Sequence, residues 1–278
     1  METGIYESIS SQEYHSDVAI NSTSLKTLLE ATPAHFKHKR DNPTVMEGDS
    51  LLAGTVLHAM LLEPNKYQDY FVIEHIDLVD KNKLEKNGGS KGQWDALKKD
   101  AEARGLPLVP YEMFRDCKGM RNSVLNNPFW RQFWPEMRCE LSLFNEIDNV
   151  PVRARFDAII GSSVILDIKT TKGRLSDKEI ESCIEKYRYD FSAAMYIEVA
   201  RSFDLPIESF VWVFVEKEAP FSCRVVQCNQ ETLDYARQDF YKALSLYKSC
   251  LQDDYWPSYD DYELPSLGLP QWYIKKNK

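Results

Sequence analysis

The sequence has no apolar run long enough to cross a bilayer and no leader pattern at its amino terminus. A membrane-spanning helix needs about 18 or more consecutive apolar residues, and no run in this chain approaches that length. The opening residues METGIYESIS contain neither a basic start nor an apolar stretch, so they do not resemble a secretory signal. We therefore expect no membrane span, and we expect a cytoplasmic protein without a membrane partner.

Closely spaced cysteines are also missing. The six cysteines are scattered along the chain, and no Cys-x-x-Cys pair occurs. Metal clusters and disulfide frameworks usually show tighter spacing, so neither is predicted. We expect reduced thiols, which are typical of cytosolic proteins.

The chain has no excess of basic residues, since its formal net charge is −9. A protein that simply coats DNA is normally basic, and this charge argues against that class. It is compatible with an enzyme that binds DNA in a local basic channel. The 278 residues, 43% of them hydrophobic, are enough for one domain with a full core, so residues 1–278 are predicted to form a single domain.

The first half of the chain, residues 1–135, is predicted to be mainly helical. An extended lead-in is expected over 1–20, and a polar loop whose lysines could contact DNA is expected over 81–93. Apolar periodicity and proline positions predict helices over 22–40 with a break at Pro33, over 50–63, and over 94–127 with an interruption near 105–110.

The second half alternates between strands and helices. A catalytic core is expected over 136–251 and an extended arm over 252–278. Alternating and β-branched segments predict strands over 139–145, 152–160, 164–170, 210–216 and 222–228. Helical periodicity predicts helices over 187–202 and 230–251. This order favours an α/β fold with a mixed central sheet, flanking helices and an amino-terminal helical addition.

Acidic and basic side chains gather on neighbouring strands of this core. Asp167 and Lys169 share one face of their strand, about 7 Å apart. If residues 161–163 form the turn, Asp157 lies opposite Asp167 on the neighbouring strand. Arg153 and Arg155 lie on the same face of their strand as Asp157. The opposite face of that strand carries Val152, Ala154, Phe156 and Ala158. Two opposed carboxylates are unfavourable unless a cation offsets them, and Mg²⁺ prefers such hard oxygen ligands.

A metal held there suits phosphodiester hydrolysis, because it polarises the phosphate and helps to ionise the attacking water. Lys169 would orient that water and offset charge that builds on the phosphate. The alternative is that the pair has no catalytic role. An Asp-x-Lys pair on one strand face is often a surface ion pair that contributes about 0–1 kcal/mol to stability.

The motif Asp157-x₉-Asp167-Ile168-Lys169 resembles that of the PD-(D/E)XK nuclease superfamily. Further blocks, in family order and across nearly the whole chain, resemble the catalytic domain of the exodeoxyribonuclease VIII family of phage and prophage recombination exonucleases. These blocks are EYHS at 13–16, GTVLHAMLLEP at 54–64, CELSLF at 139–144, RARFDAII and ILDIKTT within 153–171, RYDFSAAMY at 188–196 and WP at 256–257.

The resemblance implies roles for individual residues. It assigns the role of catalytic lysine to Lys169 and places Tyr196 beside the substrate strand. Without the resemblance, Tyr196 would be interpreted as an aromatic side chain of a helix that packs in the core. It assigns metal binding to His58, Glu140, Asp157, Asp167 and the Ile168 carbonyl. Without it, His58 in an apolar helix would be read as a packed core residue. Candidate DNA contacts are Arg153, Arg155, Lys172, Arg188 and Tyr189, whereas Ser192 stands where relatives often carry glutamine.

The resemblance also implies an activity. It predicts a Mg²⁺-dependent exonuclease, for which Mn²⁺ can substitute, that degrades the 5′ strand from double-stranded DNA ends and leaves 3′ tails. A ring-shaped homotetramer and a single-strand annealing recombinase as partner follow from the same resemblance, in the cytoplasm of a bacterial host. The alternatives are a RecB-type endonuclease or helicase-associated nuclease, and a DNA-binding module with an inactive site.

Overall fold

A six-stranded mixed sheet forms the centre of the protein. The computed structural model describes residues 1–7, 9–43, 48–74, 88–259 and 266–276. The strands lie in the order β1-β4-β5-β6-β7-β8, and only β6 and β7 are parallel neighbours. Their bounds are β1 Gly4–Tyr6, β4 Met137–Ile147, β5 Val150–Ile160, β6 Val164–Thr171, β7 Ser209–Glu216 and β8 Cys223–Gln227. The predicted mixed sheet flanked by helices is confirmed.

Tight turns set the register of the three central strands. Asp148 and Asn149 join β4 to β5 with φ values of 52° and 62°, the left-handed pair that a two-residue hairpin requires. The predicted turn over 161–163 joins β5 to β6 and begins at Gly161, whose φ is 56°. Three pairs follow it, ending at Ala158 opposite Leu166. The ladder stops one residue before the two aspartates.

A helical crossover connects the parallel strands β6 and β7, as parallel pairing requires. It consists of α10 (Asp177–Tyr187) and α11 (Tyr189–Arg201). The sequence predicted only the second helix. The missed signal for α10 is its cap, because the Ser176 hydroxyl accepts from the backbone N–H of Glu179 and also contacts the Glu179 carboxylate.

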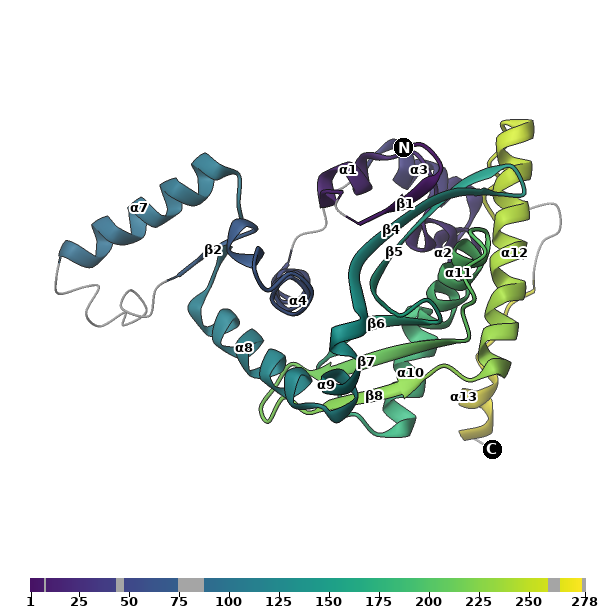
Figure 1. Cartoon of the computed structure of the whole chain (residues 1–278). Helices are drawn as coiled ribbons and strands as arrows, with labels where there is room; N and C mark the ends of the chain where they lie inside the picture. The colour runs from purple at the N-terminus through teal and green to yellow at the C-terminus, as the bar shows by residue number, and fades with distance from the viewer. Residues whose placement is uncertain (8, 44–47, 75–87, 260–265, 277–278) are drawn as a thin grey trace.

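Two helical layers cover the sheet, one on each side (Figure 1). One layer contains α2 (Ser22–Glu30), α11 and α12 (Gln230–Asp253), and α11 packs on β4 and β5. The other contains α4 (Asp49–Leu62), α8 (Tyr111–Asn126) and α9 (Pro128–Phe133), and α4 packs on β5 and β6. Strand β5 therefore has a helix on each side, α11 on one and α4 on the other.

Strands β4 and β5 change the face that they present to each layer. Leu141 and Phe156 pack in the core with α11. Cys139 and Ala158 lie two residues from them and would share their face in a regular strand, but they pack in the core with α4. The prediction that Ala158 shares a face with Phe156 is therefore wrong. In β4 the change falls at Glu140, a left-handed residue whose φ is 54°, and in β5 it falls between Phe156 and Ala158. The left-handed conformation breaks the alternation of a regular strand.

The amino-terminal region adds more structure than the sequence predicted. Strand β1 pairs with β4, and α1 (Ser11–Ser16) begins with a capping box of Ser10 and Glu13 where an extended lead-in was expected. The predicted break at Pro33 is confirmed, since α2 ends before it and α3 (Pro33–Asp41) begins there.

The remaining elements lie outside the main sheet. They are η1 (Tyr67–Asp69), η2 (Trp134–Glu136), the two-stranded parallel pair β2 (Val72–Ile73) and β3 (Leu108–Val109), and α7 (Gly88–Arg104), which projects away from the sheet in Figure 1. The polar loop expected over 81–93 lies outside the described residues up to 87, and from Gly88 the chain is helical rather than a loop. Across the described ranges, no helix has the length and apolarity to span a bilayer.

The carboxyl-terminal arm packs on the chain's own α3. Trp256 stacks on Phe36 with ring centroids 5.5 Å apart, and the Ala34 amide donates to the Pro257 carbonyl. The expected extended arm is only partly extended, because α12 continues to Asp253 and a short helix, α13, covers Gln271–Lys276. All six cysteines are free thiols.

Candidate active site

The candidate site forms where the ladder between β5 and β6 ends. Beyond the pair of Ala158 and Leu166, the Asp157 carboxylate enters the space between the strands and accepts a 2.6 Å hydrogen bond from the Ile168 backbone N–H. A side chain thus replaces the backbone partner that Ile168 would have in a regular ladder. This exchange fixes one oxygen of Asp157 and leaves the other for a second partner.

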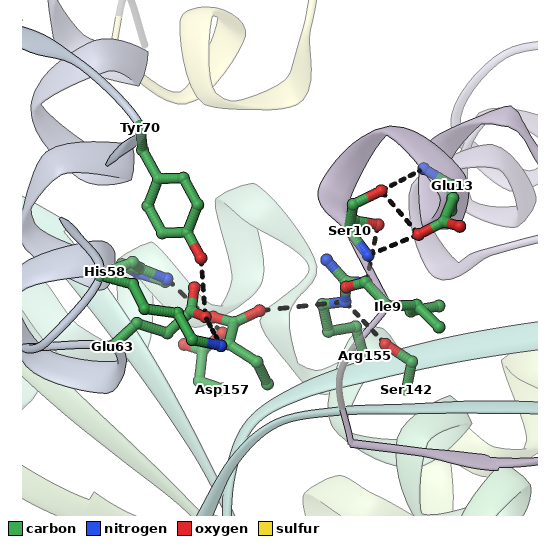
Figure 2. Close-up of polar contacts among 11 residues, drawn as sticks. Ile9, Ser10, Glu13, His58, Glu63, Tyr70, Ser142, Arg155 and Asp157 are labelled. Atoms are coloured by element: carbon green, nitrogen blue, oxygen red, sulfur yellow. Dashed lines mark hydrogen bonds and ion pairs between the residues drawn. The ribbon is translucent and has the colours of Figure 1, made fainter. Parts of the chain in front are cut away.

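His58 reaches this point from α4. Its Nε2 lies 3.2 Å from the Ile168 carbonyl oxygen, and its Nδ1 lies 3.6 Å from Oδ1 of Asp157. One ligand atom each from His58, Glu140 and Asp157 can be chosen so that all lie within 4.8 Å of one another. Figure 2 shows His58 and Asp157 pointing toward each other from the helix and the strand. The structure therefore brings together three of the predicted metal ligands and the predicted carbonyl.

Electrostatics at this cluster favour a cation. Burial, and after it the negative charge of Asp157, raise the pKa of Glu140 to about 7, while His58 and Arg155 oppose the shift. The nearest arginine atom, Nε of Arg155, is 3.8 Å from the Glu140 carboxylate. Two carboxylates, an imidazole and a backbone carbonyl form a donor set that suits a divalent cation, so the residues fit the metal that the sequence predicts.

Asp167 and Lys169 form a buried ion pair on the side of β6 that faces α2 and α11. Lys169 Nζ lies 2.7 Å from Oδ2 of Asp167, which is 4% exposed. Burial raises the pKa of Asp167 and Lys169 opposes the rise. Burial also lowers the pKa of Lys169, but Asp167 and Asp157 outweigh it and raise that pKa, so the ammonium is charged. Asp167 is thus paired with Lys169 in this conformation and stands beside the three-residue cluster.

The predicted residues of α11 lie against the core. Tyr196 packs on Phe156 and Phe210, with ring centroids 5.5 Å and 6.3 Å away. Its ring therefore braces the residue before Asp157. Ser192 is buried, and its hydroxyl lies 3.3 Å from the Ser22 hydroxyl of α2. Ser192 joins two helices and does not point to solvent.

Arg153 and Arg155 attach the amino-terminal segment to the sheet. Arg153 is 6% exposed, and its guanidinium donates to the Asp17 carbonyl. Arg155 donates to the Ser142 hydroxyl at 2.7 Å and to the Ile9 carbonyl at 3.2 Å, as Figure 2 shows. Both guanidinium groups lie over the Tyr14 ring. Arg153 is thus enclosed by the fold, away from any solvent-facing phosphate, and Arg155 links α1 to the neighbourhood of Glu140.

The other candidate DNA contacts differ in their exposure and in whether other side chains of the protein already pair with them. Lys172 is exposed just after β6. Arg188 pairs with Asp190 at 3.2 Å and with Asp239 at 2.6 Å, so its charge is already offset. Tyr189 lies against the ion pair, with its ring centroid 4.9 Å from Lys169 Nζ.

Sequence reasoning missed two residues at the edge of the cluster, Glu63 and Tyr70. The Tyr70 hydroxyl donates to Oε1 of Glu63 at 2.8 Å, and Figure 2 shows this pair beside His58. Glu63 adds to the negative charge that raises the pKa of Glu140. Before Pro64, Glu63 resembled an ordinary helix end, so no local signal marked it.

Comparisons with known proteins bear on the family and the fold of the chain. Residues 21–263 match the model of a family described as a PDDEXK-like domain of unknown function, DUF3799. A crystal structure of a candidate exonuclease from Eubacterium rectale is similar, with a TM-score of 0.63 and 12% identity over 96% of this chain and 98% of that chain, a level that shows a shared fold. The structure of SSO0001 has a TM-score of 0.27 and 15% identity over 88% of this chain and 90% of that chain, too low to carry an argument. No curated protein matches. Because the family model covers most of its length, the chain belongs to the DUF3799 family of PDDEXK-like domains.

Proposed function

We propose that this protein is a metal-dependent nuclease that hydrolyses DNA phosphodiesters. The observation that carries the proposal is the gap between β5 and β6, where Asp157 holds the Ile168 amide beside His58 and Glu140. Lys169 and Asp167 stand next to that cluster as a charged pair. This combination of carboxylates, imidazole and ammonium suits phosphate chemistry better than it suits a structural role.

Each side chain has a defined part in the proposed reaction. His58, Glu140, Asp157 and the Ile168 carbonyl would hold a divalent cation, with Asp167 able to join them when Lys169 turns to substrate. When bound, such a cation polarises the phosphate and favours ionisation of the attacking water. Lys169 stabilises the negative charge that develops on the phosphate as the water oxygen bonds to phosphorus. The sugar oxygen then leaves and takes up a proton from solvent, which balances the proton that the attacking water releases to solvent.

The finer proposal is a Mg²⁺-dependent exonuclease, also active with Mn²⁺, that acts on double-stranded ends in the 5′-to-3′ direction. Sequence blocks that resemble the exodeoxyribonuclease VIII family support it, as do the proposed homotetrameric ring and the proposed annealing recombinase that would use the 3′ tails. Arg155, Lys172 and Tyr189 remain candidate DNA contacts under this proposal. A net charge of −9 requires that the contacting surface be locally basic.

Digestion of linear and closed circular duplex DNA tests the proposal. Wild type with Mg²⁺ should remove only the linear form, and a chelator should prevent it. Lys169→Ala should bind metal yet lose most turnover, whereas Lys242→Ala, which changes an exposed lysine on α12, should cut normally. Cutting of the circle would indicate an endonuclease, and absence of cutting would indicate a DNA-binding module.

A further inference from the structure

Two tyrosines stack at the junction of α10 and α11. Tyr187 ends the first helix and Tyr189 begins the second, with only Arg188 between them. Arg188 adopts the left-handed conformation, with φ 48° and ψ 49°. The turn at this residue brings the rings of its two neighbours together, with centroids 5.5 Å apart and planes inclined by 27°. The local backbone thus builds an aromatic stack.

The stack leads from the candidate active site to solvent. At its inner end, the Tyr189 ring centroid lies 4.9 Å from Lys169 Nζ. At its outer end, Tyr187 is 51% exposed, and Lys186 Nζ lies 5.3 Å from its ring centroid. At about 3.4 Å per stacked nucleotide, the Tyr187 ring is no more than about three nucleotides from the ammonium of Lys169. An exposed aromatic ring therefore stands within reach of a strand bound at the site.

Three lysines, Lys26, Lys169 and Lys186, lie near the stack. Lys26 of α2 donates from its ammonium to the Tyr187 carbonyl at 3.1 Å. Burial, and after it the nearby charge of Lys169, lower the pKa of Lys26 to about 8. The acidic neighbours Asp190 and Asp239 both pair with Arg188, which offsets one of their two negative charges. The amines of Lys26, Lys169 and Lys186 can therefore attract the phosphates on either side of a base.

From these contacts we infer that the exposed Tyr187 ring is a stacking platform for an unpaired base of the DNA strand whose phosphate is cut beside Lys169. This inference rests on the proposed nuclease function. A ring of this kind binds any base, because every base has a π face, and nearby cations track the backbone. Bases inside a duplex are covered on both faces, so only a terminal or unpaired base can use the platform. The site would therefore select frayed or single-stranded ends.

Fluorescence of 2-aminopurine tests this inference directly. Duplexes would carry the probe base at either terminus, with the end pairs mismatched or fully paired, and Ca²⁺ would replace Mg²⁺ to prevent cutting. Wild type should quench the probe in the mismatched ends, because stacking on Tyr187 shortens its excited state. Tyr187→Ala should lose the quenching and bind these ends roughly 5- to 150-fold more weakly.

Matched variants separate stacking from a structural effect. Tyr187→Phe keeps the ring and should retain quenching and affinity. Tyr235→Ala removes a tyrosine on α12 that is 65% exposed, and should behave as wild type. Unchanged quenching and affinity in folded Tyr187→Ala would overturn the platform, as would equal losses in the Phe and Ala variants. Either result leaves the nuclease proposal intact if wild type cuts linear DNA and Lys169→Ala does not.

Discussion

Replacing Glu140 by glutamine should stabilise the metal-free protein at neutral and alkaline pH. The folded protein raises the pKa of Glu140 from its ordinary 4.5 to about 7, by burial first and then by the charge of Asp157. Between these values the folded state holds a proton that the unfolded chain has released. The free energy of unfolding therefore falls as pH rises from 4.5 to 7, and the full loss of stability is present above pH 7.

The size of this effect follows from the two pKa values. Each pH unit between them contributes about 1.36 kcal/mol, which gives about 3 kcal/mol. The Glu140 side chain is 26% exposed, and solvent screening reduces the figure to about 2 kcal/mol. Glutamine has the same side-chain length as glutamate and the same energetic cost in the left-handed backbone conformation. The comparison of wild type with Glu140→Gln therefore isolates the effect of the charge. For a domain of this size, the melting temperature should rise by about 4–8 °C.

Thermal and urea unfolding of wild type and Glu140→Gln at pH 4 and pH 8, with chelator, measures the difference. The variant should be more stable at pH 8 and nearly equal to wild type at pH 4. Added Mg²⁺ should stabilise wild type and have a smaller effect on the variant, because the cation loses a charged ligand. A variant no more stable than wild type at pH 8 would refute the argument that crowded carboxylates at this site await a cation.

Three other substitutions test the roles of neighbouring residues. Phe156→Ala empties a fully buried position beneath Tyr196 and should cost about 3–5 kcal/mol in urea unfolding; a smaller loss would mean that the site collapses around the cavity. Arg153→Met leaves the buried Asp17 with less countercharge and should cost about 3 kcal/mol, with loss of DNA affinity only in proportion to unfolding. Ser192→Ala should change cutting less than about twofold and lower stability by about 1 kcal/mol, since its hydroxyl contacts Ser22; a large loss of cutting would restore a DNA contact at this position.

Local patterns predicted most of the central sheet. The glycine turn at 161–163 fixed the register of β5 and β6, and helix breakers at Pro33 and Pro64 fixed the ends of α2 and α4. These features depend on residues adjacent in sequence, which is why they could be recognised there.

Features that depend on distant contacts were not predictable in the same way. The left-handed Glu140 lies in a segment whose alternation is typical of a regular strand, so the change of face was missed. The position of His58 beside Ile168 depends on how α4 packs on the sheet, and only a family resemblance indicated it. Tyr187 had no signal at all, because its stacking needs the backbone turn at Arg188.

The change of face in β4 and β5 has a consequence for cooperativity. Each strand of this hairpin contributes to both cores, Leu141 and Phe156 to one and Cys139 and Ala158 to the other. Neither helical layer can detach without removing support from the hairpin that holds the second layer. The protein should therefore unfold as one unit despite its two cores. The cluster around Asp157 lies at the junction, so it exists only while both layers are folded.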